Sequence, residues 1–134
     1  MKHRLKVLSI FAFCIYLTAV AVLCFIRPSS LPEMDIKTFL GIPIDKILHF
    51  IMFLPYPVLS GMVFISKEQK RHTVIATLFI LALTGIGVSY GTEMIQSHTD
   101  YRSYEIADFY ADIAGIAAGS IITASCLIYT RLKK

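Results

Sequence analysis

Charge is scarce in this chain of 134 residues and is missing from long stretches of it. Lys, Arg, Asp and Glu together make up 16% of the residues, whereas soluble domains average about 25%. Hydrophobic residues make up 56%, above the roughly 45–50% of a soluble domain. Because the apolar residues are also gathered into long runs, the composition indicates a membrane protein.

The motifs of several enzyme classes are missing as well. Cys14, Cys24 and Cys126 lie inside apolar runs and lack metal-ligand spacing, so we expect no disulfide framework and no cysteine metal site. There is no HExxH or other paired ligand motif, and no serine or threonine stands in a nucleophile elbow. The absence of these motifs therefore predicts no resident metal and no cofactor. Histidine and carboxylates from three segments are residue types that suit Zn²⁺ or Mn²⁺, so metal binding stays open as the alternative.

Four uncharged or nearly uncharged segments dominate what is present. They cover residues 7–26, 44–65, 73–96 and 106–129. A helix needs about 20 apolar residues to cross the hydrocarbon core of a bilayer, and each segment meets that length. We therefore predict an all-α integral membrane protein, a four-helix bundle forming a single domain over residues 1–134.

Two of these segments carry further signals. The first follows a short basic N-terminus, as a cleaved signal peptide would, but it is longer than the h-region of about 7–15 residues that such peptides have. A retained helix is the favoured interpretation, and cleavage stays open. In the second segment, Pro55 and Pro57 predict a kink.

The basic residues predict the orientation. With four crossings, both termini and the middle loop lie on one side of the membrane. That side holds nine Lys and Arg residues, and the other side holds Arg27, Lys37, Lys46 and Arg102. The positive-inside rule then places both termini in the cytoplasm, N-in and C-in, in the inner membrane. The net charge of +4 is explained by this topology, and we expect no nucleic-acid partner.

Polar residues gather at the opposite ends of three segments. Asp45, Lys46 and His49 begin the second, Glu93 and Gln96 end the third, and Asp108 and Asp112 begin the fourth. At 1.5 Å per residue, all would lie at one level, roughly 0–10 Å below the outer interface. Ionisable residues within membrane helices usually face the bundle interior and pair with one another, and they mark candidate functional sites.

These residues form the predicted binding site together with one arginine of the connecting loop. The site consists of Asp45, Lys46, His49, Glu93, Gln96, Arg102, Asp108 and Asp112. We expect His49 to be hydrogen-bonded to Glu93 or Asp112, in preference to serving as a metal ligand. A network closed by Arg102 and Lys46 is the structural alternative to a general acid/base pair of Glu93 and Asp112.

Small residues also recur at helical spacing. Gly87 and Gly91 form a small-xxx-small pair in the third segment, and Ala111, Gly115 and Gly119 repeat every four residues in the fourth. Such stripes allow helix backbones to approach closely in membranes. We expect the two stripes to dock against each other.

The order of the polar motifs resembles the VanZ-like family of bacterial membrane proteins. That family shows DKxxHF, GxxxExxQ and RxxSxxDxxxNxxGxxxG on small helical bundles, and the resemblance covers about residues 43–119. Three positions depart from it: Ser89 stands in place of the glycine, Glu105 in place of a small residue, and Asp112 in place of Asn. The resemblance implies a cell-envelope protein and a link to glycopeptide resistance, since the family's namesake is associated with resistance to teicoplanin.

Three hypotheses on function follow. The first is a polar pocket in the outer leaflet that binds an envelope lipid, a glycopeptide or a partner. The second is a membrane-embedded hydrolase or transferase acting on a lipid-linked substrate, with Glu93, Asp112 or His49 as the catalytic candidates. A proton-relaying transporter is disfavoured, because the inner halves of all four segments lack titratable groups. Whether the protein is an enzyme, and its oligomeric state, are left open.

Overall fold

Four apolar helical segments make up nearly all of the computed structural model, which describes residues 2–25, 38–66, 68–98 and 105–132. The helices are α1 (Lys2–Phe25), α2 (Ile44–Phe53), α3 (Pro55–Phe64), α4 (Arg71–Ser97) and α5 (Ile106–Leu132), with α2 and α3 forming one span between them. All four segments are long and apolar enough to cross a membrane. The all-α, four-span prediction is confirmed.

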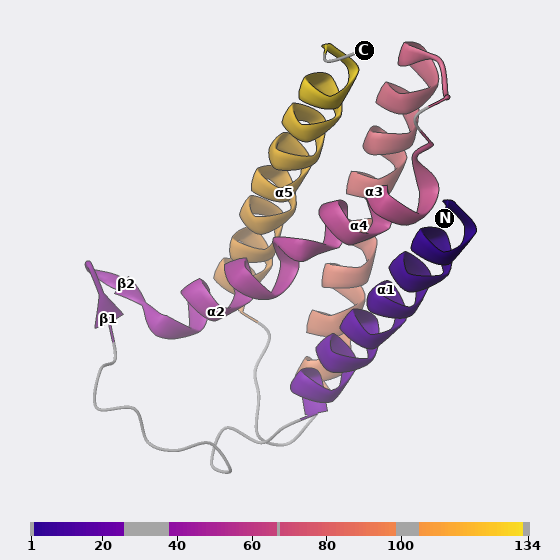
Figure 1. The fold of residues 1–134 in the computed structure, drawn as a ribbon. Coiled ribbons are helices and arrows are strands. Elements are labelled where there is room, and N and C mark those ends of the chain that lie inside the picture. Colours follow the sequence, from indigo (N-terminus) through magenta and orange to yellow (C-terminus); the bar gives the residue numbers. More distant parts are fainter. Residues whose placement is uncertain (1, 26–37, 67, 99–104, 133–134) are drawn as a thin grey trace.

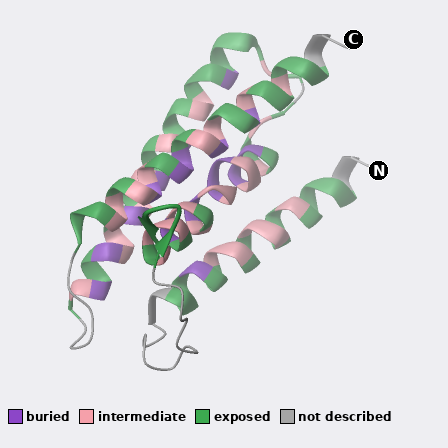
Figure 2. Ribbon diagram, turned by 90° about the vertical axis from the view of Figure 1, so that its left-hand side faces the viewer, coloured by how far each residue is buried: buried purple, intermediate pink, exposed green. Residues whose placement is uncertain are grey.

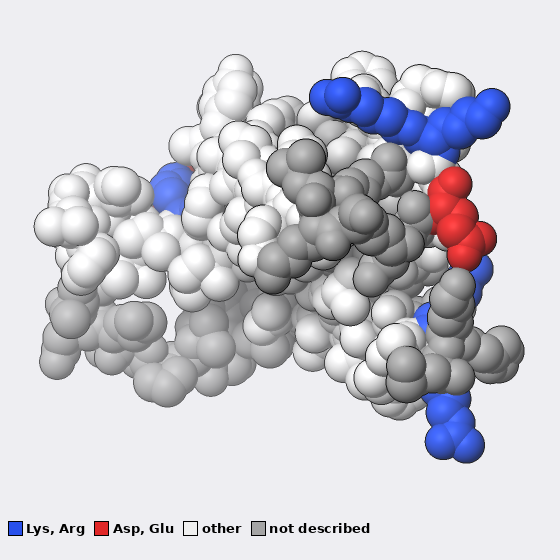
Figure 3. Space-filling model, turned by 45° about the horizontal axis from the view of Figure 1, so that its top comes forward, with Lys and Arg blue, Asp and Glu red and all other residues white. Residues whose placement is uncertain are grey.

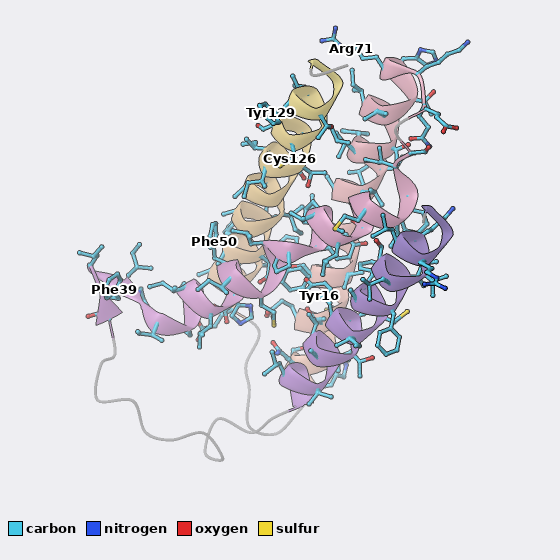
Figure 4. All side chains as sticks on the ribbon, viewed as in Figure 1. Tyr16, Phe39, Phe50, Arg71, Cys126 and Tyr129 are labelled. Carbon is cyan, nitrogen blue, oxygen red and sulfur yellow. The ribbon has the colours of Figure 1, made fainter. Side chains whose placement is uncertain are left out.

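Helix α1 lies at the side of the bundle and is the least buried of the four spans. Figure 2 shows buried residues concentrated where the other helices face one another, whereas α1 is mostly intermediate or exposed. Among the α1 side chains that the structure describes, Val20 is the buried apolar one, packed in the core with Phe53 and Ile116. A helix that is apolar on all sides suits a lipid environment. The Tyr16 hydroxyl, labelled in Figure 4, ties α1 to the bundle by donating a hydrogen bond to the Met52 carbonyl over 2.8 Å.

The second span is broken at Leu54, between α2 and α3. Pro55 is the first residue of α3, where its missing N–H and fixed φ are tolerated. The Leu54 N–H still donates to the Phe50 carbonyl over 3.0 Å, so the chain turns without a gap in its backbone hydrogen bonding at that residue. The kink predicted from Pro55 and Pro57 is confirmed.

The break between α2 and α3 packs against the glycines of α5. A Cβ atom at Gly119 would overlap the Leu54 carbonyl oxygen, and one at Gly115 would overlap the Phe50 carbonyl oxygen. Glycine is needed at both positions because main-chain atoms occupy the space of a side chain. The α5 stripe therefore packs against α2 and α3.

The expected contact between two glycine stripes is wrong. Gly87 and Gly91 of α4 have no neighbouring atom within 4 Å of a built Cβ in the part of the chain that the structure describes. The glycine of α4 that does approach another helix is Gly85, where a Cβ would lie 2.8 Å from the Tyr56 ring. Small residues on both helices allowed several pairings, and the bend at Leu54 brings a different backbone against α5.

A short hairpin precedes α2. Strands β1 (Thr38–Phe39) and β2 (Ile42–Pro43) pair antiparallel, and Leu40 and Gly41 form the turn with φ values of 52° and 80°. Positive φ at both central residues is the pattern of a type I′ turn. The hairpin projects from the bundle (Figure 1), and its side chains, including that of Phe39 in Figure 4, are exposed.

Charge is unequally placed along the bundle. The first residues of α1, the α3–α4 connection and the end of α5 lie towards one end of the molecule (Figure 1). Exposed basic side chains there include Arg4, Lys6, Lys70 and Arg71, and Figure 3 shows the Lys and Arg side chains of this end grouped around an acidic one. The polar residues of the predicted site lie at the opposite end.

Candidate functional site

The site is formed where α2 begins, α4 ends and α5 begins. Asp45 and His49 are four residues apart on α2, and Asp108 and Asp112 are four residues apart on α5, so each pair shares one helix face. Glu93 and Gln96 lie one turn apart and are both buried on α4. The prediction that three helices bring their polar groups to one level is confirmed by the contacts that follow.

The innermost part is a buried cluster of His49, Glu93 and Asp112, one residue from each of α2, α4 and α5. Their exposed fractions are 4%, 1% and 0%. His49 Nδ1 donates to Asp112 Oδ1 over 3.0 Å and lies 3.6 Å from Glu93 Oε1. The expected hydrogen bond between His49 and a carboxylate is thus confirmed, with Asp112 as the acceptor.

Ser89 completes the surroundings of Asp112. Its hydroxyl lies one turn before Glu93 on α4 and donates to Asp112 Oδ2 over 2.7 Å. Both oxygens of the Asp112 carboxylate are therefore hydrogen-bonded, which a fully buried carboxylate requires. In the sequence, Ser89 stands out only as a departure from the family motif. Its spacing of four residues from Glu93 is the signal that places both on one face.

A second group of charges lies further out and is centred on Lys46. We call it the Lys46 group. The Lys46 ammonium donates to Asp45 over 2.9 Å, to Glu105 over 2.5 Å and to Asp108. Asp45 and Glu105 are about half exposed, whereas Asp108 is largely shielded. These contacts join the first turn of α2 to the first turn of α5.

Asp108 connects the Lys46 group to the buried cluster. One of its oxygens accepts from Lys46, and the other lies 3.6 Å from His49 Nε2. His49 is therefore flanked by carboxylates on both ring nitrogens, with Asp112 at Nδ1 and Asp108 at Nε2. This arrangement fixes the ring orientation and leaves little freedom for rotation.

A small cavity opens beside the cluster. It has a volume of about 250 Å³ and lies between α1, α2 and α4. Asp45, His49 and Gln96 form its polar side. Four apolar side chains form the remainder of the wall, namely Leu23, Leu48, Ile51 and Met52.

The structure thus brings together seven of the eight residues of the predicted binding site. Arg102 lies outside the described residues, and with it the predicted closure of the network by that guanidinium. Lys46 takes the other predicted role, since it neutralises Asp108 directly. Of the catalytic candidates, Glu93 and Asp112 approach the same nitrogen of His49.

Comparison with known protein families identifies the family of the chain. The sequence profile described as VanZ/LLP1 matches residues 11–129, which include most of the four spans and every residue of the site. This chain belongs to the VanZ/LLP1 family. No curated protein and no solved structure matched the chain.

For this VanZ/LLP1 protein, the arrangement supports three kinds of chemistry. The carboxylates can accept hydrogen bonds from a donor-rich or cationic group. The His49–Asp112 pair can hold and move a proton next to the cavity. Two carboxylates and an imidazole that converge on one point also have the donor set of a divalent metal site.

Proposed function

We propose that this VanZ/LLP1 membrane protein binds the headgroup of an envelope lipid in the cavity beside His49. The observation that carries the proposal is the two-sided lining of that cavity. Asp45, His49 and Gln96 supply a polar wall, and apolar side chains of α1 and α2 supply the rest. Leu48 and Ile51 of that wall are more than half exposed, which in a bilayer means contact with lipid.

The size of the cavity favours a lipid over a glycopeptide. Pockets for drug-sized ligands measure about 300–1,000 Å³, and this cavity measures about 250 Å³. It would therefore take a headgroup, with the acyl chains left in the bilayer. A glycopeptide, with its linked sugars and aromatic rings, would have to bind elsewhere.

The charges of the site indicate the chemistry of the headgroup. The described carboxylates at this end belong to Asp45, Glu93, Glu105, Asp108 and Asp112. Among the described residues, Lys46 and His49 are basic side chains in contact with these carboxylates. An excess of acceptors favours a headgroup with an ammonium or several hydroxyl donors.

The distribution of charge supports a location for the site. The basic end of the bundle suits the cytoplasmic side of the inner membrane, so the site would open in the outer leaflet. Binding of an envelope lipid there would be the route by which such a protein influences glycopeptide resistance.

Native mass spectrometry of the full chain tests the proposal. Protein released from vesicles of phosphatidylethanolamine and phosphatidylglycerol should retain phosphatidylethanolamine preferentially, because its ammonium suits the acidic wall. Asp45→Ala should reduce that preference at least several-fold. Glu68→Ala, which removes an exposed carboxylate at the opposite end, is the matched control. Equal retention of both lipids, or equal behaviour of the two variants, would contradict the proposal.

A membrane-embedded hydrolase or transferase is the second candidate, and the His49–Asp112 pair favours it. A histidine oriented by a buried carboxylate beside a cavity can act as a general base. Ser89 is not its nucleophile, because its hydroxyl donates to Asp112 and is fully buried. Such an enzyme would use water or an acceptor hydroxyl. Turnover of a lipid-linked substrate that is lost in His49→Gln while lipid retention is kept would establish catalysis.

A further inference from the structure

We infer that the buried cluster of His49, Glu93 and Asp112 is a binding site for a divalent transition-metal ion of the Zn²⁺ type. The three ligand groups come from three different helices and are each at least nine-tenths buried. Their residue types were visible in the sequence, but their convergence was not. The inference does not depend on lipid binding, because the ion would sit at the cluster whether or not the cavity is filled.

The spacing of the ligand atoms fits one ion. Atoms from all three residues lie within 4.8 Å of one another. His49 Nδ1 lies 3.0 Å from Asp112 Oδ1 and 3.6 Å from Glu93 Oε1. Ligands about 2.0 Å from a tetrahedral zinc are separated by about 3.3 Å, and the two distances lie on either side of that value. Small side-chain rotations would bring all three atoms into range.

The side chains next to these ligands, Asp108 and Ser89, match what a metal site requires. A metal-bound histidine usually directs its other ring nitrogen to a carboxylate, and a metal-bound carboxylate is itself hydrogen-bonded. His49 Nε2 faces Asp108 Oδ2 at 3.6 Å. The Ser89 hydroxyl donates to Asp112 Oδ2 over 2.7 Å, which leaves Oδ1 for the ion. When the ion binds Nδ1, the ring proton moves to Nε2, towards Asp108.

A divalent cation also suits the charges of the cluster. Glu93 and Asp112 bring two carboxylates into a buried space, and His49 offers at most one positive charge to them. Buried charges are stable when they are paired or coordinate a metal. One divalent ion would neutralise the two carboxylates of the cluster.

The Lys46 group is not the metal site, although it contains three carboxylates close together. Asp45, Glu105 and Asp108 also lie within 4.8 Å of one another. A lysine ammonium already occupies the point at which they converge. Asp45 and Glu105 are about half exposed, so water competes for them. The group also lacks a nitrogen ligand, which a transition metal prefers.

The cavity offers space for a fourth ligand. The three protein groups leave one position of a tetrahedral ion unfilled, as in catalytic zinc sites. His49 lies on the wall of the cavity, so water or a headgroup oxygen has space next to the ion.

Metal titration of the purified full chain tests the inference. After treatment with a chelator, the protein in detergent is titrated with Zn²⁺, and bound metal is measured by elemental analysis together with the midpoint of thermal unfolding. We expect one Zn²⁺ per chain and a rise in the midpoint with metal concentration, since an ion that binds only the folded state stabilises it. Mg²⁺, which prefers oxygen ligands, should bind at least tenfold more weakly.

Zn²⁺ binding by substituted proteins tests whether the ion binds at the buried cluster. Glu93→Gln and His49→Gln should each weaken Zn²⁺ binding at least tenfold, whereas Glu105→Gln, which removes an exposed carboxylate of the Lys46 group, should leave it unchanged. If the first two variants fold poorly, the wild-type titration still decides. The absence of stoichiometric Zn²⁺ and of any stabilisation by it would overturn the inference, as would loss of binding in Glu105→Gln alone. The lipid preference is measured separately in metal-free protein, so failure of either proposal is recognisable on its own.

Discussion

Ser89 and Asp112 face each other across the interface of α4 and α5, and the serine hydroxyl donates to the aspartate over 2.7 Å. Both residues depart from the VanZ-like motifs, which have glycine and asparagine at these positions. The two departures are complementary, because the added carboxylate gains the added donor. The third departure behaves in the same way, since Glu105 accepts from Lys46 over 2.5 Å.

The first prediction concerns this pair. Ser89→Ala should destabilise the protein by about 1–3 kcal/mol, because it leaves a buried carboxylate oxygen without its donor. In the Asp112→Asn background the same change should cost less, since the group left behind is neutral. A double-mutant cycle on the free energy of unfolding measures the difference, which we expect at about 0.5–3 kcal/mol. Strict additivity of the two changes would show that the hydrogen bond does not couple them.

The second prediction concerns His49. His49→Ala removes one partner of a buried pair and should destabilise the protein by about 3–5 kcal/mol. His72, at the beginning of α4, is exposed, so His72→Ala should change stability by less than about 0.5 kcal/mol. Thermal unfolding of both variants in detergent gives the comparison. A similar result for the two histidines would argue against a paired His49.

The third prediction uses two glycines that sequence reasoning treated alike. Gly119→Ala should destabilise by about 1–3 kcal/mol or more, because a methyl group would overlap the Leu54 carbonyl. Gly87→Ala meets no described atom within 4 Å and should stabilise α4 by up to about 0.5–1 kcal/mol through its higher helix propensity. Unfolding midpoints of the two variants should therefore move in opposite directions.

A loss of stability in Gly87→Ala would have a specific meaning. It would place a further helix against that face of α4, as in an oligomer. Cross-linking in the bilayer would then identify the contact.

The fourth prediction concerns Lys46. Lys46→Gln removes the ammonium that joins the first turns of α2 and α5, and the carboxylates of the Lys46 group should then repel each other. Hydrogen exchange should rise in the first turns of α5 and remain unchanged in its second half. The cost in stability should be about 1.5–3 kcal/mol, the range for hydrogen bonds to charged groups. Lys70→Gln, which changes an exposed lysine, serves as the control.

The fifth prediction concerns orientation. A reporter fused after Lys134 should be active in the cytoplasm, and a cysteine-reactive probe that does not cross membranes should label Thr38→Cys from outside. The reason is the excess of Lys and Arg at the end of the bundle that carries the termini. An extracytoplasmic signal from the C-terminal fusion would contradict the predicted orientation and indicate the opposite one.

Sequence reasoning recovered the parts of the fold that depend on local pattern. The apolar runs specified four spans because length and hydrophobicity alone decide whether a helix can cross a bilayer. Pro55 and Pro57 located the break because proline acts on its own backbone. Asp45, His49, Glu93 and Asp112 were placed at one level because depth in a membrane follows from residue count.

Pairing between helices could not be predicted in the same way. Gly115 and Gly119 indicate that a helix approaches closely, but not which one, and the partner depended on the bend at Leu54. Ser89 was noted as a departure from the family motif, and its hydrogen bond became evident only when α5 brought Asp112 opposite it. The convergence of His49 with both Glu93 and Asp112 likewise depends on rotations of three helices about their axes.

The contact between the Leu54 carbonyl and Gly119 has a consequence for how related sequences evolve. Because the overlapping atoms at Leu54 and Phe50 belong to the main chain, mutation of those two side chains leaves the constraint on Gly115 and Gly119 in place. The close contacts occur at the bend, and Pro55 and Pro57 stand at the same point. Lineages that lose Pro55 and Pro57 should therefore also be released from the glycines. Lineages that keep both prolines should inherit Gly115 and Gly119 with them, as one unit of covariation that spans two helices.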